Sequence, residues 1–125
     1  MQYILLVYVD EQRFAALSED AKNRVHDETL AWQAELEKAG HARGQLGLHA
    51  ASTATTLREK HGRLLMTDGP FAETKELLGG FSIVDCKNLD AALELAKRFP
   101  GLSHGLAVEV RPCFTGDPRN PADLP

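Results

Sequence analysis

The stretch between Thr67 and Phe81 holds the densest group of side chains that could bind a ligand or move a proton. Asp68 stands before Gly69 and Pro70, and a Gly-Pro pair favours a turn because proline fixes its own φ and disfavours the α region before it. A carboxylate on such a turn is held on firm backbone, where it can exchange a proton. Asp68 is therefore a candidate catalytic residue, and a purely structural turn former is the alternative.

The residues after this turn are unusually rich in charge for a simple connection between two apolar runs. Loops of this kind, placed between rigid elements, often carry function. The alternative is that their charged side chains form a solvated surface. The candidate ligand-binding residues in this loop are Pro70, Phe71, Glu73 and Lys75.

Five histidines supply further candidates for proton transfer. His26 falls at the edge of the apolar stripe of a predicted helix, where an imidazole can act as a general acid or base. A boundary histidine bonded to a nearby polar group is the alternative. His49 closes a predicted strand and is a candidate ligand-binding residue. No two histidines have the i, i+4 spacing of a helical metal site and no Cys-x-x-Cys occurs, so we expect no bound metal.

Arg111 lies on the last predicted strand and points away from Val110. A buried arginine needs a carboxylate as its partner, and an anionic ligand would serve equally. Arg111 is therefore a further candidate ligand-binding residue.

The motif Asp-Gly-Pro-Phe-Ala-Glu-Thr-Lys-Glu that begins at Asp68, followed by Gly-Gly-Phe from Gly79, resembles the signature of the DGPF subgroup of YCII-related proteins. The resemblance extends from Met1 to Pro112. It implies a ferredoxin-like α+β fold that pairs into a dimeric α/β barrel. It implies little about activity.

Members of this family are thought to use a histidine on the first helix together with an aspartate that precedes a proline after the second helix. In this sequence the family's histidine position falls on Thr29, one helical turn after His26. The residue before Pro100 is Phe99, so the usual aspartate is missing. This sequence therefore departs from the family's pattern, and our candidates for the two roles are His26 for the imidazole and Asp68, before Gly69 and Pro70, for the carboxylate.

Two functions from different classes fit these observations. The first is a cofactor-independent enzyme that transfers protons between an Asp–His pair and a small cyclic or phenolic substrate; one branch of the family resembles this, being a dehydrochlorinase of chlorinated hydroxyquinols. The second is a non-catalytic ligand-binding or regulatory protein, because DGPF proteins are often encoded beside extracytoplasmic-function sigma factors. An apolar pocket without titrating groups would favour the second function.

The composition is that of one globular domain, with 125 residues of which 43% are hydrophobic and 26% are charged. A formal net charge of −4 argues against a nucleic-acid partner, which would require a basic surface. No apolar run approaches the ~20 residues of a membrane helix and no secretory signal is recognised, so we expect a cytoplasmic protein. In that compartment Cys86 and Cys113 are expected to be free thiols.

Apolar periodicity, turn residues and helix caps predict the elements that must position these side chains. Residues 10–17 are expected to form a loop. A β-hairpin is expected around the turn at 60–62. The remaining predicted elements are a strand at 2–9, a helix from Ser18 to Ala39, strands at 42–49, 81–86 and 106–114, and a second helix capped by Asn88.

Without the hairpin, the order of these elements is β-α-β-β-α-β, which with right-handed crossovers gives the ferredoxin-like split βαβ fold. We expect one domain at 1–114 and a proline-rich tail at 115–125. The strand at 2–9 is apolar on both faces, so both faces must be covered. Helices of the chain can cover one face, and the other predicts a homodimer with its sheets packed face to face.

Overall fold

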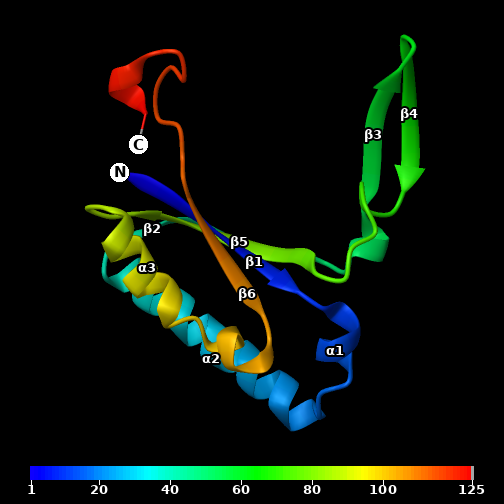
Figure 1. Ribbon diagram of the computed structural model, residues 1–125. Helices are drawn as coiled ribbons and strands as arrows, with labels where there is room; N and C mark the ends of the chain where they lie inside the picture. The colour runs from blue at the N-terminus through cyan, green and yellow to red at the C-terminus, as the bar shows by residue number, and fades with distance from the viewer. Residues whose placement is uncertain (125) are drawn as a thin grey trace.

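The computed structural model describes residues 1–124 as one sheet covered by helices, with a separate hairpin (Figure 1). The strands are β1 (Gln2–Val9), β2 (Ala42–Gly47), β3 (Thr55–Lys60), β4 (Arg63–Asp68), β5 (Leu77–Asp85) and β6 (Ala107–Pro112). The α-helices are α1 (Glu11–Ala15), α2 (Glu19–Lys38) and α3 (Leu89–Lys97). Short 3₁₀ helices lie at Ala51–Thr53, Pro100–His104 and Pro121–Asp123.

Four strands form an antiparallel sheet in the order β2-β5-β1-β6. Both long helices, α2 and α3, lie on one face of this sheet (Figure 1). Leaving out the β3–β4 hairpin and the short α1, the order along the chain is β-α-β-β-α-β. The mixed α/β class with an antiparallel sheet is therefore confirmed.

Strand β1 is one of the two inner strands of the sheet, and its side chains alternate between two different environments. Tyr3 and Leu5 are buried beneath the helices, at 4% and 0% exposure. The cross-strand partners of Leu5 are Ser82 and Val110, which therefore face the helices as well. The core on this side contains Tyr3, Leu5, Trp32, Leu36, Val84, Cys86, Ala92, Leu95, Ala96 and Phe99.

Helix α2 begins and ends where the sequence predicts. The hydroxyl of Ser18 accepts a hydrogen bond from the Ala21 amide at 3.1 Å, which satisfies one free N–H of the first turn. Gly40 follows the helix with φ of +80°, the left-handed conformation that ends many helices. The helix buries one stripe, made of Val25, Trp32 and Leu36.

Several predicted boundaries are wrong. Strand β2 ends at Gly47, so His49 lies after it, and β6 ends at Pro112. Residues 10–17 are not wholly a loop, because the Asp10 carboxylate accepts from the Arg13 amide at 3.2 Å and starts helix α1. Strand β5 begins at Leu77 rather than Phe81, so Gly79 and Gly80 lie inside the strand.

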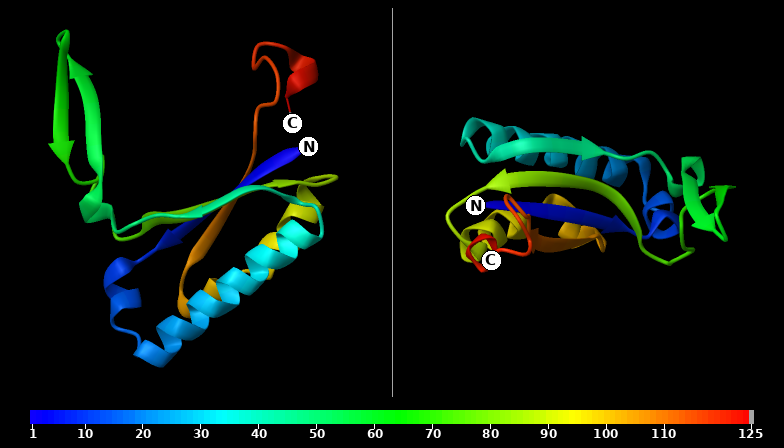
Figure 2. Two further views of the ribbon diagram at one scale, coloured as in Figure 1. Left: turned by 180° about the vertical axis from the view of Figure 1, so that it is seen from behind. Right: turned by 90° about the horizontal axis from the view of Figure 1, so that it is seen from above.

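The hairpin of β3 and β4 is joined to no other strand of the described chain. Its tip is a two-residue turn in which His61 and Gly62 have φ of +53° and +74°, as in the turns that match strand twist. The predicted hairpin is therefore confirmed. It stands away from the sheet on the side opposite the helices (Figures 1 and 2).

Among the described residues, no α-helix covers the other face of the sheet (Figure 1). Ile4 and Leu6 on β1 lie on this face, beside Ile83 and Phe81 of β5. All four are only half-buried, and Leu46 of β2 is 61% exposed at the same level. An apolar sheet face of this kind in contact with water is unfavourable, which keeps the predicted homodimer as our expectation.

We predict that light scattering gives twice the 13.7 kDa mass of one chain at micromolar concentration. Leu6→Lys should yield folded single chains, since a charge would then be buried without a partner between the two sheets. The matched control is Leu89→Lys, because Leu89 is an exposed leucine that lies on α3 at the other side of the sheet. A single-chain mass for the unaltered protein would contradict the prediction.

Candidate functional site

A cavity of about 660 Å³ lies between helix α2 and the sheet, closed at one end by α1. Its volume is that of a typical small-molecule site. Most of its wall is apolar or aromatic. The wall is formed by Val7, Val9, Glu11, Phe14, Ala15, Lys22, Val25, His26, Thr29, Trp32, Gln33, Leu46, Leu48, His49, Ala50, Gly79, Phe81, Ser82, Phe99 and Leu106.

Two glycines of β5 lie on the sheet side of this cavity, Gly79 in its wall and Gly80 beside it. A Cβ on Gly80 would lie 2.9 Å from the Leu46 carbonyl oxygen, so β2 could not approach β5 as it does. A Cβ on Gly79 would lie 3.0 Å from Cγ1 of Val9. The register between β1 and β5 shifts at this level, between Val7 and Tyr8. Shifts of this kind bend strands and re-aim side chains.

The buried end of the cavity is aromatic and rigid. The rings of Trp32 and Phe99 meet edge to face, with their centroids 5.2 Å apart, and both side chains are 5% exposed. The indole N–H of Trp32 donates to the Leu95 carbonyl at 3.1 Å, so this buried donor is satisfied. The Trp32–Phe99 end of the cavity is therefore suited to an apolar ring.

A chain of polar groups crosses the floor of the cavity. Ser82, at 1% exposure, donates from its hydroxyl to Oε1 of Gln45 at 3.0 Å. The Gln45 amide donates in turn to the Gln33 carbonyl on α2 at 3.1 Å. These bonds fix the distance between α2 and the sheet at this level, because unpairing them would leave buried polar groups unsatisfied.

Ionisable side chains gather at the mouth of the cavity. The imidazoles of His26 and His49 are exposed there, one from α2 and one from the segment after β2. Glu11 accepts a hydrogen bond from the Ala51 amide at 2.8 Å, which connects α1 to the 3₁₀ helix at Ala51–Thr53. Lys22 donates to Glu19 at 3.2 Å. The mouth therefore combines two imidazoles, an ammonium and a carboxylate around an apolar interior.

The candidate residues fall into two groups. His26 and His49 line the cavity, as does Thr29, the position where the family pattern places its histidine. Phe99, which stands where that pattern places an aspartate, also lines it. The other candidates lie outside the walls of this cavity within one chain, on β4, in the loop after it or on β6; they are Asp68, Pro70, Phe71, Glu73, Lys75 and Arg111.

Asp68 ends β4 at the base of the hairpin, where its side chain is exposed. The turn after it is held by backbone, because the Gly69 amide donates to the Ala54 carbonyl at 2.7 Å. Gly69 has φ of +100°, which only glycine adopts without strain. The predicted turn is therefore present, and the catalytic role of Asp68 stays a prediction.

Arg111 projects from the helix-free face and not toward the cavity. Both oxygens of Glu109 accept from its Nη2 at 3.0 Å, and the Tyr8 hydroxyl donates to the same carboxylate at 3.1 Å. The Arg111 hydrogen bond is the main cause that lowers the pKa of Glu109. Burial, followed by the bond to Glu109, raises the pKa of Tyr8. A carboxylate partner for Arg111 is thus present, but the arginine is exposed and not buried, and its role in ligand binding stays a prediction.

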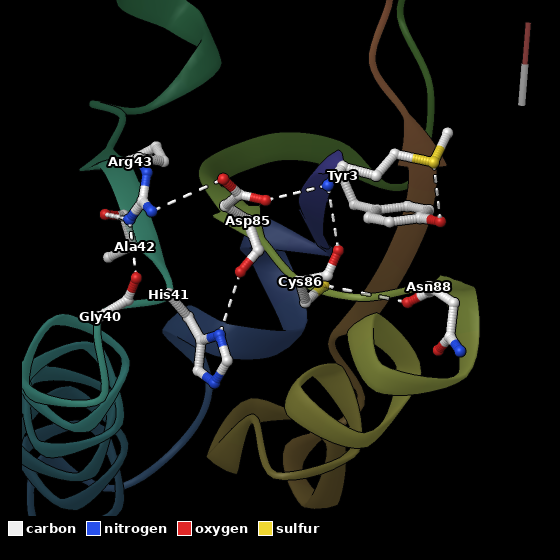
Figure 3. Close-up of polar contacts among 9 residues, drawn as sticks. Tyr3, Gly40, His41, Ala42, Arg43, Asp85, Cys86 and Asn88 are labelled. Atoms are coloured by element: carbon white, nitrogen blue, oxygen red, sulfur yellow. Dashed lines mark hydrogen bonds and ion pairs between the residues drawn. The ribbon is translucent and has the colours of Figure 1, made fainter.

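A second ionic cluster lies near the chain's N-terminus and does not line the cavity (Figure 3). The Asp85 carboxylate accepts from the Met1 ammonium at 3.0 Å and lies 3.6 Å from the Arg43 guanidinium. The hydrogen bond from Met1 is the main cause that lowers the pKa of Asp85. His41 Nδ1 lies 3.0 Å from the Asp85 carbonyl. This cluster joins β2 to the end of β5.

Within residues 1–124, no group of three or more His, Cys, Asp or Glu side chains could hold a metal ion. Cys86 is buried and Cys113 half-buried, and both are free thiols. No helix of this described part is long and apolar enough to cross a membrane. Burial raises the pKa of the Cys86 thiol, which disfavours the reactive thiolate.

Sequence reasoning missed Glu11 and Lys22. Asp10 is a residue type that often caps a helix, and this was the available signal for α1. Recognising this cap would have placed Glu11 in the first turn of a helix. Lys22 lies one helical turn before His26 on α2, and this spacing places both on one face. Nothing in the sequence indicates that α1 and α2 meet at one opening.

This antiparallel sheet with helices on one face and a cavity beneath them defines the class as a small mixed α/β domain. The YCII-related domain matches residues 1–113, and the chain belongs to this family. An uncharacterized protein of Rhizobium meliloti, R00369, is 38% identical over 113 residues, which cover 90% of this chain and 91% of that protein.

A solved structure has a similar fold. It is a 5-chloro-2-hydroxyhydroquinone dehydrochlorinase from Burkholderia phenoliruptrix, in complex with 2,5-dihydroxybenzoquinone. The TM-score is 0.55 at 15% sequence identity, and the match covers 93% of this chain and 96% of that one. At this identity the similarity shows a shared fold and nothing further.

We predict that Gly80→Ala destabilises the protein by about 1–3 kcal/mol, because the added methyl group must push β2 away from β5. The matched control is Gly47→Ala. Gly47 pairs with Gly80 across the same two strands, but a Cβ there would meet nothing within 4 Å. Chemical denaturation of both variants provides the test, and equal midpoints would refute the close approach.

Proposed function

We propose that this protein binds a small, mostly apolar cyclic or phenolic molecule in the cavity between α2 and the sheet. The observation that carries the proposal is the combination of a rigid aromatic end, made by Trp32 and Phe99, with two imidazoles at the mouth. A ring can pack at the aromatic end while its hydroxyl or carbonyl groups meet the imidazoles.

We further propose that the protein is an enzyme that works without a cofactor, with His26 as general acid or base. An imidazole in reach of a phenolic hydroxyl can accept its proton and return it at a neighbouring position. A carboxylate would orient the imidazole and stabilise its charged form. Glu11 lines the same cavity and is the first choice for this role; Asp68, at the hairpin base, remains the second.

A purely regulatory role is the weaker alternative. It would be favoured by an apolar pocket without titrating groups, whereas this cavity has His26, His49, Lys22 and Glu11 in its wall. The similar fold of a dehydrochlorinase whose structure contains 2,5-dihydroxybenzoquinone adds support for phenolic ligands. The remaining parts of the proposal are membership of the DGPF subgroup, a cytoplasmic location and a homodimer of ferredoxin-like subunits with no nucleic-acid partner.

We predict that 2,5-dihydroxybenzoquinone binds to the protein and that His26→Gln weakens this binding by about tenfold, the effect of one lost hydrogen bond to a charged group. The matched control is His61→Asn, since His61 lies at the exposed hairpin tip with φ of +53° and asparagine tolerates that conformation. Isothermal titration calorimetry measures both. Equal dissociation constants for the two variants would remove His26 from the site.

The catalytic half of the proposal has a separate test. We predict chloride release from 5-chloro-2-hydroxyhydroquinone or a related chlorinated phenol, slowed about 100-fold or more in His26→Gln and unchanged in His61→Asn. Release of chloride is followed with an ion-selective electrode. Binding without any turnover across such a substrate series would leave a ligand-binding protein and contradict the enzyme.

A further inference from the structure

The β3–β4 hairpin is an isolated element in this chain. Neither strand pairs with the four-stranded sheet, and every residue of β4 is exposed. A two-stranded hairpin alone in water is at best marginally stable. An element that stands away from its own domain in this manner needs another surface to hold it.

The two faces of the hairpin differ in chemistry. Cross-strand pairing puts Leu57 opposite Met66 and Glu59 opposite Leu64 on one face. The three apolar side chains of this face are 60%, 70% and 66% exposed, and we call it the apolar face of the hairpin (Leu57, Leu64, Met66).

The opposite face carries three cations, since Lys60 pairs with Arg63 and Arg58 pairs with Leu65. Leu65 is the most protected of the hairpin's large apolar side chains, at 43% exposure. Charges on one face and exposed apolar groups on the other are typical of an element that packs one face against a partner.

The position of the hairpin indicates which partner. It rises beside the helix-free face of the sheet, while the C-terminal segment rises at the other end of that face (Figures 1 and 2). A body seated on the helix-free face would therefore lie next to the hairpin. The helix-free face has an apolar part, where Ile4, Leu6 and Phe81 are half-buried, beside the Arg111–Glu109 pair of β6.

A second copy of the chain is the occupant that covers both surfaces together. In a two-fold dimer each copy supplies one helix-free face and one hairpin, so both uncovered apolar surfaces are buried by one symmetric contact. Two hydrogen bonds join β3 to the loop after β4. Thr56 donates from Oγ1 to the Gly69 carbonyl at 2.8 Å, and Arg58 donates to the Phe71 carbonyl at 3.1 Å.

We propose that the β3–β4 hairpin is a clasp that packs its apolar face against a second copy seated on the helix-free face of the sheet. The proposal rests on the homodimer expected above and adds the element that locks it. It gives the apolar side chains of the hairpin a partner, and the three cations of the opposite face remain in solvent.

The test compares two neighbouring leucines of β4 that point to opposite faces. Leu64→Thr keeps a β-forming residue but removes apolar area from the clasp, twice in each dimer. We expect its dimer dissociation constant to rise about tenfold or more, and that of Leu65→Thr to stay within about twofold of the unaltered protein. Sedimentation equilibrium measures the constants, and circular dichroism checks that both variants are folded.

A photo-cross-link provides the second readout. With p-benzoylphenylalanine in place of Met66, ultraviolet light should join the hairpin to a second copy, and mass spectrometry identifies the peptide that is reached. A stable dimer with equal constants for both threonine variants, or cross-links only within one chain, would overturn the clasp and leave the dimer standing. A single-chain mass for the unaltered protein would overturn both. Ligand binding in the cavity is measured in a separate experiment, so failure of the proposed function can be distinguished from failure of the clasp.

Discussion

The structure depends on one constraint, a central strand that is apolar on both faces. Leu5 of β1 is completely buried beneath α2 and α3, while its neighbours Ile4 and Leu6 face the side without helices. Each face must be removed from water, since burying a leucine side chain contributes about 1.5–3 kcal/mol. The helices satisfy the first requirement. The need to cover the helix-free face is the physical reason to expect a partner. We propose that the hairpin beside this face helps to hold that partner.

The cavity is a consequence of how the first face is covered. Helix α2 packs through Val25, Trp32 and Leu36, and the Ser82–Gln45–Gln33 hydrogen bonds set its distance from the sheet. At Gly79 and Gly80 of β5 the neighbouring atoms of Val9 and Leu46 come close to the backbone, and Gly79 lines the cavity. The cavity is thus bounded by the same contacts that form the core, which is closely packed.

The sequence predicts the secondary-structure elements better than it predicts the tertiary contacts between them. The 2–9 strand, the caps of α2 and the hairpin follow from local rules on periodicity, caps and turns, and the structure confirms them. The cavity walls depend on distances between segments far apart in the sequence, such as Glu11 and Ala51. Local patterns could place His26 at the edge of its helix stripe, but could not show that Asp68 lies outside the cavity walls of its own chain.

The most direct test of the central claim is a crystal structure of the protein grown with 2,5-dihydroxybenzoquinone. Our account predicts the ring in the cavity between α2 and the sheet, stacked toward Trp32 and Phe99, with one of its oxygens within hydrogen-bond distance of the His26 imidazole. A ring bound on the helix-free face, or in a position that leaves this cavity to water, would contradict it.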